Sequence, residues 1–95
     1  YQNPIEVSKE LVPFLRDKKR CDLVICLSHL GFESNPATVS DSTLAVAVGD
    51  IDIIIGGHTH KLLEGKVVNS VQITQLDYGG IRVGKIDIYK QEEHE

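Results

Sequence analysis

The strongest constraint on the fold is an apolar run that ends in two glycines and two histidines. Residues 51–55 are Ile-Asp-Ile-Ile-Ile, and Gly56-Gly57-His58-Thr59-His60 follows directly. β-branched residues favour strands, and a short apolar run bounded by glycine is typical of a strand buried on both faces. Open α/β sheets build their active sites beyond the carboxyl ends of such strands. The run therefore predicts a strand over 52–55 and places His58 and His60 in a candidate site.

A second apolar segment, Leu23–Leu27, predicts another strand that is covered on both sides and ends close to a histidine, His29. Residues 32–39 are expected to form a loop over the site. A helix between the two strands completes a βαβ unit, whose strands are parallel and joined by a right-handed crossover. Parallel strands end at the same edge of a sheet, so His29 is expected to approach His58 and His60.

Two helices are expected. The first covers Pro4–Arg20, with Asn3 as its N-cap and a kink or break at Pro13. Its apolar face is predicted to contain Ile5, Leu11, Phe14 and Leu15, and its basic end, Arg16, Lys18, Lys19 and Arg20, is expected to be solvated. The second begins at Asp41, its expected cap, and ends at Gly49 in a left-handed conformation. It carries Leu44, Ala45 and Val48 at helical spacing.

The pattern after His60 changes to short strands separated by turns. Strands are expected at Lys66–Asn69, Val71–Asp77 and Arg82–Tyr89, paired antiparallel with one face covered. The turns are expected at residues 63–65, around Ser70 and at residues 78–80. The charged tail, residues 90–95, is expected to be frayed, and its His94 is not expected to be a ligand.

Composition limits the kinds of protein to consider. Ninety-five residues make one small domain or a piece of a larger one, and the absence of methionine indicates a fragment or processed product. A net charge of −4 lacks the basic footprint of nucleic-acid binding, and no apolar run approaches the roughly 20 residues that span a membrane. Cys21 and Cys26 point to opposite faces of an extended strand, which disfavours a disulfide or a zinc pair.

The residues of the two strand ends resemble a known family. Gly57-His58-Thr59-His60, preceded by residues 52–56, resembles the Gly-His-(Thr/Ser)-His motif of calcineurin-like metallophosphoesterases. Ser28-His29-Leu30-Gly31 resembles the Ser-His-Leu-Gly motif of the same family. The Asp-x-Thr-Leu-Ala helix between them and the later Gln75-Leu76-Asp77-Tyr78-Gly79 segment are most similar to the 5'-nucleotidase and UDP-sugar hydrolase branch. The resemblance covers about residues 22–89.

The resemblance implies an α/β fold: a four-layer α/β/β/α sandwich, of which residues 1–95 would be the C-terminal portion of the catalytic domain. It implies two divalent ions, zinc, manganese, iron or cobalt, with His29 and His58 on one ion and His60 on the other. Such a pair of ions activates a water for attack at phosphorus. It also implies a nucleotide or other phosphate ester as substrate, and a periplasmic or extracellular location.

This sequence departs from the family because the first half of its pattern is absent. No Asp-x-His appears near the N-terminus, and neither a Gly-Asp that would supply the bridging ligand nor an Asn-His-Glu segment is found, nor is the domain that stacks the nucleoside base. Glu33, Asp41 and Asp77 match none of those motifs and are expected to be solvated or capping residues. The chain alone is therefore expected to be inactive. Its exposed sheet edge, unpaired without the missing half, is expected to drive dimerisation or strand swapping.

Two other functions fit the residues less well. The chain could be a small α/β binding or interaction module whose histidines hold one structural metal or none. It could also be a self-sufficient hydrolase that uses histidine and aspartate without metal, although no Gly-x-Ser-x-Gly elbow or Cys-His pair is present.

Overall fold

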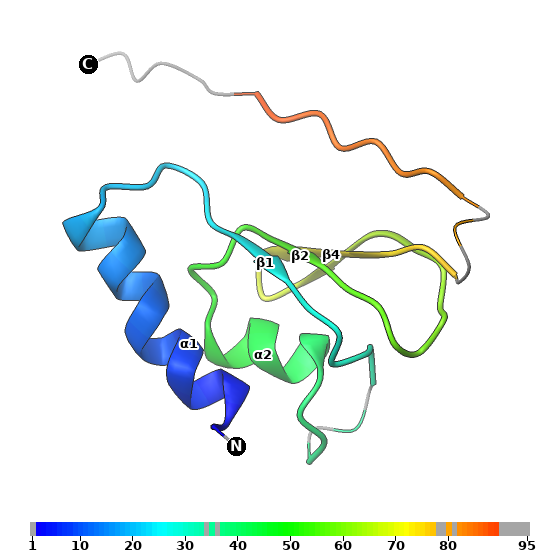
Figure 1. The fold of residues 1–95 in the computed structure, drawn as a ribbon, viewed down its shortest axis with the longest axis horizontal. Helices are drawn as coiled ribbons and strands as arrows, with labels where there is room; N and C mark the ends of the chain where they lie inside the picture. Colours follow the sequence, from blue (N-terminus) through cyan, green and yellow to red (C-terminus); the bar gives the residue numbers. More distant parts are fainter. Residues whose placement is uncertain (1, 34, 36, 78–79, 81, 90–95) are drawn as a thin grey trace.

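The fold is a four-stranded sheet with helices on one side, seen in a computed structural model that describes residues 2–33, 35, 37–77, 80 and 82–89. Its elements are α1 (Pro4–Pro13), a π-helical turn η1 (Phe14–Lys18), β1 (Ile25–Leu27), α2 (Asp41–Ala47), β2 (Ile53–Ile55), β3 (Leu63–Val68) and β4 (Val71–Gln75). Both helices lie on the same side of the sheet, and residues 82–89 run past its other side (Figure 1). The expected α/β class is confirmed, whereas the four-layer sandwich remains a prediction.

The first helix begins where the sequence indicates, and its hydrogen bonding changes at Pro13. Asn3 Oδ1 accepts hydrogen bonds from the backbone N–H groups of Ile5, at 2.9 Å, and Glu6, at 3.4 Å. Pro4 occupies the first turn, where its missing N–H costs nothing. α1 ends at Pro13, and the chain continues as the π-helical turn η1. The irregularity expected at Pro13 is therefore confirmed as a change from α- to π-helical bonding, but the helix runs on to Lys18 and does not break into two helices.

The predicted apolar face of this helix is wrong in part. Leu11 and Phe14 are 49% and 45% exposed, whereas Val12 is buried. Ile5 and Leu15 do pack against the core, as expected. Val12 lies seven residues after Ile5 and three before Leu15, which places the three side chains on one helical face. At 3.6 residues per turn, Leu11 lies at the margin of that face and Phe14 lies nearly opposite to it.

The sheet order is β1-β2-β4-β3. β1 and β2 are parallel, with Ile25 opposite Ile53, so the expected parallel pair is confirmed. β4 pairs parallel with β2 on its other side and antiparallel with β3. The β3–β4 turn at Asn69 and Ser70 is where the sequence predicts it, and both residues have positive φ. The hairpin is therefore antiparallel as expected, and β4 joins it to the parallel pair in one mixed sheet.

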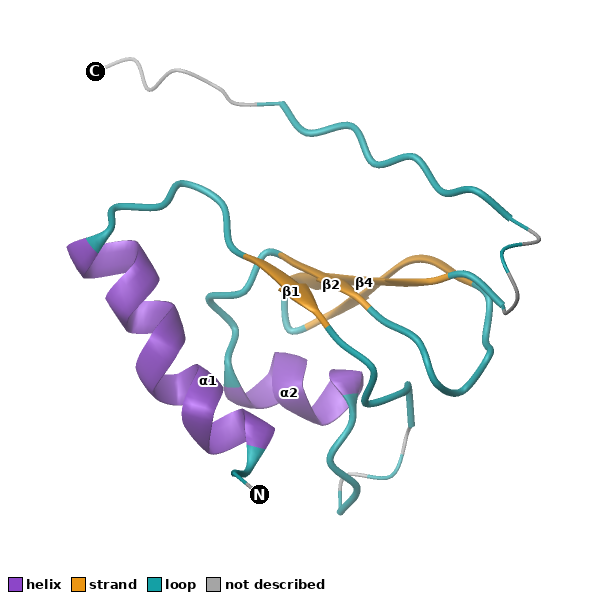
Figure 2. Cartoon of the chain, viewed as in Figure 1, coloured by secondary structure: helices purple, strands orange, loops and turns teal. Residues whose placement is uncertain are grey.

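Two predictions for the second half are wrong. Residues 63–65 form no turn, because they belong to β3, where Gly65 adopts a φ of 83° and shifts the register with β4. A glycine at positive φ is the usual site of such a bulge. Residues 82–89 form no strand and are drawn as loop in Figure 2. The predicted turn at 78–80 lies mostly outside the described residues, and the tail 90–95 with His94 lies wholly outside them.

The core lies between the sheet and the helices. Its most deeply buried apolar side chains are Leu44, Ala45, Ile51, Ile54, Val71 and Ile73. On β1 the side chains alternate, and Ile25 and Leu27 are 44% and 80% exposed. The expectation that β1 is covered on both sides is therefore wrong for the described residues, because both helices cover the same face. No described helix is long and apolar enough to span a membrane.

The ends of α2 differ from the prediction. Ser40 is the N-cap, and its N–H donates to Thr43 Oγ1 at 2.8 Å. Asp41 is therefore the first helical residue, not the cap. The helix ends at Ala47, and Gly49 is not left-handed. Instead, Asn69 Nδ2 donates to the carbonyls of Ala45 and Val46, both at 3.1 Å, which satisfies two acceptors of the last turn.

Candidate functional site

Two histidine-bearing loops meet at the carboxyl ends of β1 and β2. Ser28 N–H donates to the Ile55 carbonyl at 2.9 Å, which continues the parallel pairing past the strand ends. Beyond this bond, the imidazoles of His29 and His58 pack edge to face with 5.2 Å between ring centroids. Both histidines are exposed. The parallel strands thus bring together two side chains that are far apart in the sequence.

Two glycines permit this close approach. A Cβ on Gly57 would lie 3.1 Å from His29 Nδ1. Gly31 has a φ of +86°, and a Cβ there would lie 2.7 Å from Thr59 Cγ2 and 3.3 Å from His58 Cδ2. Gly57, on the loop after β2, therefore faces His29 on the loop after β1. Gly31, on the loop after β1, faces His58 and Thr59 on the loop after β2. A larger residue at either position would push the loops apart.

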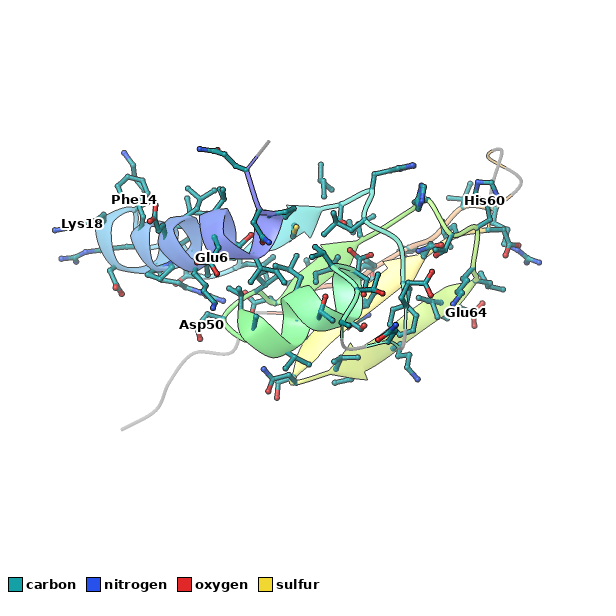
Figure 3. All side chains as sticks on the ribbon, turned by 90° about the horizontal axis from the view of Figure 1, so that it is seen from below. Glu6, Phe14, Lys18, Asp50, His60 and Glu64 are labelled. Atoms are coloured by element: carbon teal, nitrogen blue, oxygen red, sulfur yellow. The ribbon has the colours of Figure 1, made fainter. Side chains whose placement is uncertain are left out.

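His60 is also exposed, and Figure 3 shows it at the opposite end of the molecule from Phe14 and Lys18. It lies beyond the carboxyl end of β2, on the same loop as His58. In the part of the chain that the structure describes, however, no group of three or more His, Cys, Asp or Glu side chains could hold a metal ion. The structure brings His29 and His58 together and does not complete a three-residue set with His60.

The distance between the first two histidines suits a shared ion. With Zn–N bonds of about 2.0–2.1 Å and tetrahedral angles, two imidazoles on one zinc have ring centroids about 5 Å apart. The observed 5.2 Å matches that spacing. The spacing thus leaves room for one ion between the two rings, and it is also ordinary for an edge-to-face ring pair, whose centroids lie about 4.5–7 Å apart.

The turn that carries His58 and His60 is strained. His58 has a φ of 78° and His60 a φ of 54°, on either side of Thr59. Left-handed backbone at a residue other than glycine costs on the order of 1–3 kcal/mol, and such residues cluster at functional sites. Other contacts must hold the turn in this conformation.

Gln75, at the end of β4, supplies those contacts. Its Oε1 accepts from Thr59 Oγ1 at 3.0 Å and from the Lys61 N–H at 2.8 Å. Thr59 Oγ1 also accepts from the Phe32 N–H at 3.1 Å, and Lys61 Nζ donates to the Phe32 carbonyl at 3.0 Å. Gln75 is 1% exposed, so these bonds lie in a shielded environment. The strained turn is thus bonded both to β4 and to the loop that follows β1.

Asp41 holds the other loop. Its Oδ1 accepts from Ser28 Oγ at 2.5 Å, and its N–H donates to the Gly31 carbonyl at 2.8 Å. Asp41 is fully buried, which corrects the expectation of a solvated or capping residue. Burial raises the pKa of the carboxyl group, and the Ser28 hydrogen bond lowers it in part. Asp77, also expected to be solvated or capping, is ion-paired with Arg82.

Sequence reasoning missed the two buried side chains that support the site, Asp41 and Gln75. One signal for Gln75 was available, because Val71, Ile73 and Gln75 alternate along β4 and all point into the core. A polar residue at a core-facing position of a strand normally destabilises the core, so its presence there indicates a functional role. Asp41 begins the Asp-x-Thr-Leu-Ala segment that resembles the 5'-nucleotidase branch, but an aspartate at a helix start is ordinarily explained by capping.

A cleft of about 460 Å³ lies next to this region, between the β3–β4 hairpin and residues 84–86. Gly56 and Gln75 reach its wall, but no histidine lines it. It is therefore separate from the histidine pair.

The known proteins that are similar to this chain are named as a metallophosphoesterase, a nucleotide phosphoesterase, an apyrase and a 5'-nucleotidase. No protein-family model matches the chain. A metallophosphoesterase of Bacillus subtilis strain 168, YunD, is 39% identical over 85 residues, which are 88% of this chain and 17% of that protein. An apyrase of Tabanus yao is 46% identical over 78 residues, 73% of this chain and 13% of the apyrase.

A 5'-nucleotidase of Vibrio cholerae is 30% identical over 67 residues, 64% of this chain and 12% of that enzyme. The chain thus spans less than a fifth of the length of each of these relatives. The names of the relatives agree with the family that the two histidine motifs indicate, and metallophosphoesterases as a family use divalent metal ions. The chain belongs to the calcineurin-like metallophosphoesterases, in the branch that includes the 5'-nucleotidases.

Proposed function

We propose that residues 1–95 are the C-terminal portion of the catalytic domain of a metal-dependent phosphoric ester hydrolase of the 5'-nucleotidase type. The observation that carries the proposal is the pairing of His29 and His58, with 5.2 Å between ring centroids, at the carboxyl ends of two parallel strands. Neutral imidazole is the commonest metal ligand in proteins. His29 and His58 would hold one divalent ion, and His60 would contribute to a second.

Divalent ions bound there supply charge neutralisation for a phosphate ester and activation of water near neutral pH. The chain's own contribution is to orient the imidazoles. The glycines let the loops approach, and the bonds to Gln75 and Asp41 hold them in place. Substrates are proposed to be nucleotides or other phosphate esters, since the relatives include a trifunctional nucleotide phosphoesterase, an apyrase and a 5'-nucleotidase.

The chain alone is proposed to lack activity. Three neutral histidines carry no negative charge to hold two dications close together, and the described residues hold no metal-binding group of three. The bridging carboxylate and the remaining ligands would come from the other half of the domain.

A Co²⁺ titration of the 95-residue chain tests the histidine ligands. Absorption between about 500 and 700 nm, where the d–d transitions of a tetrahedral cobalt site fall, reports the binding. His29→Ala and His58→Ala are expected to weaken binding by about tenfold or more, and His60→Ala by less. His94→Ala is the matched control and is expected to bind as the wild type does. Equal binding by all four variants would refute the proposed ligands.

An activity assay tests the second part. The chain is mixed with zinc, manganese, iron or cobalt and assayed on nucleoside monophosphates and a nitrophenyl phosphate ester. No turnover above the metal-only blank is expected. Turnover at enzyme-like rates would show that this segment holds a complete catalytic site.

A second candidate function is a small α/β binding module without a catalytic metal. The observation that favours it is the lack of a three-residue metal group among the described side chains. It predicts that Co²⁺ does not bind the chain, or binds it independently of His29 and His58. The cobalt titration therefore separates the two functions.

The partner of the sheet is proposed to be the other half of the domain or a second copy of the chain. β1 is an edge strand of the described sheet, and its Leu27 is 80% exposed. Unpaired edges and exposed apolar faces favour association. Light scattering is expected to give a mass above the 10.5 kDa of one chain, and a monomer at high concentration would contradict this.

A further inference from the structure

Two buried side chains next to the histidine loops each leave one polar atom without a partner. Among the side chains that the structure describes, the buried polar atoms lacking a hydrogen bond are Asp41 Oδ2 and Gln75 Nε2. A buried polar atom without a partner is costly, and native structures keep few of them. The two atoms are complementary, since a carboxylate oxygen accepts and an amide nitrogen donates.

The orientation of the Gln75 amide follows from its bonds. The backbone N–H of Lys61 can only donate, so the group 2.8 Å from it must be the oxygen Oε1. The Thr59 hydroxyl bonds the same oxygen at 3.0 Å. The nitrogen Nε2 therefore points away from the histidine turn.

Both unpartnered atoms converge on Gly56. The position of a Cβ on Gly56 lies 3.6 Å from Gln75 Nε2 and in contact with Asp41 Oδ2. Gly56 N–H donates to the Thr74 carbonyl at 2.8 Å, which fixes this glycine beside the end of β4. Only a residue without a side chain leaves the space above Gly56 open to both groups.

We propose that Asp41 and Gln75 are positioning residues of the metal site, which form one buried frame across Gly56. One water that accepts a hydrogen bond from Gln75 Nε2 and donates one to Asp41 Oδ2 closes the frame. Through Ser28 and Gly31, Asp41 sets the loop that carries His29. Through Thr59 and Lys61, Gln75 holds the strained turn that carries His58 and His60. The role of Asp41 and Gln75 in positioning metal ligands rests on the proposed metal-binding function.

The first test needs no metal. Backbone amide exchange is measured by NMR in Gln75→Ala and in Gln72→Ala, the matched control from the same strand. The Lys61 amide is expected to exchange at least about tenfold faster in Gln75→Ala and to change by less than about twofold in Gln72→Ala. Unchanged protection at Lys61 in a folded Gln75→Ala chain would overturn the frame, whatever the chain binds.

The second test measures Co²⁺ affinity in the same variants. Gln75→Ala is expected to weaken binding about tenfold, as loss of a supporting side chain does at other metal sites, while Gln72→Ala keeps wild-type affinity. If the histidine variants lose binding and Gln75→Ala does not, the positioning role is wrong and the metal site stands. If no histidine variant loses binding, the proposed function itself fails.

Two further variants, Gln75→Glu and Asp41→Asn combined with Gln75→Glu, test the frame if Gln75→Ala does not fold. Gln75→Glu keeps an acceptor for Thr59 and Lys61 but turns a second carboxylate oxygen toward Asp41, and it is expected to weaken Co²⁺ binding. The double variant Asp41→Asn with Gln75→Glu restores one donor and one acceptor across Gly56. It is expected to recover at least about half of the lost affinity. Wild-type binding by Gln75→Glu, or a double variant no better than Gln75→Glu, would overturn the frame.

Discussion

The hydroxyl of Ser28 donates a 2.5 Å hydrogen bond to the buried Oδ1 of Asp41, and this bond joins the loop after β1 to the first turn of α2. The second carboxylate oxygen is buried against Gly56, beside the histidine turn. A carboxyl group in this position has an altered tendency to ionise, because burial disfavours its charged form. A change in the ionisation of Asp41 is therefore expected to change the stability of the fold.

The first prediction concerns this coupling. Burial raises the pKa of Asp41 above its ordinary 3.8 in the folded chain. The stabilising contribution of Asp41 is therefore complete below the unfolded pKa and is lost as the pH rises through the folded pKa. Asp41→Asn has no proton to lose, so the free energy of unfolding should shift in favour of the variant with rising pH. Urea unfolding of both chains from about pH 3 to about pH 7 measures this, and a difference independent of pH would contradict it.

The second prediction compares two left-handed glycines. Gly31 and Gly80 have φ values of +86° and +69°, but of the two only Gly31 has neighbours within 4 Å of the position that a Cβ would take, the nearest being Thr59 Cγ2. Gly80→Ala is expected to cost about 1 kcal/mol from backbone strain alone. Gly31→Ala is expected to cost about 1–3 kcal/mol more, because Thr59 must move. Thermal and urea unfolding measure the difference, and equal costs would show that the loops are not in close contact.

The third prediction concerns Arg16, which the sequence places at a solvated helix end. Its guanidinium instead donates to Asp52 Oδ2 and to the carbonyl of Asp50, both at 2.6 Å, and to the carbonyl of Asp22 at 3.0 Å. These bonds join η1 to the segments that lead into β1 and β2. Arg16→Ala is expected to lower the free energy of unfolding by about 1–3 kcal/mol, because Asp52 loses its ion-pair partner and keeps only the Val24 N–H as donor, and the carbonyls of Asp22 and Asp50 lose a charged donor. Lys18→Ala, an exposed neighbour, should change it by less than about 0.5 kcal/mol.

The fourth prediction separates the two faces of the sheet. Ile54 is fully buried against the helices, and Leu27 is 80% exposed on the other face. Ile54→Ala is expected to cost about 2–5 kcal/mol through lost burial and a cavity. Leu27→Ala should change the stability of the monomer by less than about 0.5 kcal/mol. Urea unfolding at low protein concentration measures both. A large cost for Leu27→Ala would indicate that this face is covered in solution.

Local patterns were enough for the elements that depend on neighbours in the sequence. The Asn3 cap with Pro4, the change of helical bonding at Pro13 and the turn at Ser70 each follow from backbone chemistry within a few residues. The parallel pairing of β1 and β2 was also predictable, because a βαβ connection leaves little choice.

Predictions failed where a segment's environment decided its structure. Residues 82–89 have the composition of a strand but no hydrogen-bonded partner strand in the described sheet. Gly65 could mark a turn or a bulge, and pairing with β4 made it a bulge. Leu11 and Phe14 fit a helical face, but the position of the sheet selected Val12 for burial instead.

The order of residues alone indicated that His29 and His58 follow two parallel strands, because a βαβ connection leaves little choice of strand direction. Only the packed structure decided what supports them. Asp41 and Gln75 come from different elements, and both become buried beside Gly56 when α2 packs under the sheet and β4 pairs with β2. No periodicity in the chain encodes that meeting, since it depends on contacts between segments distant in the sequence.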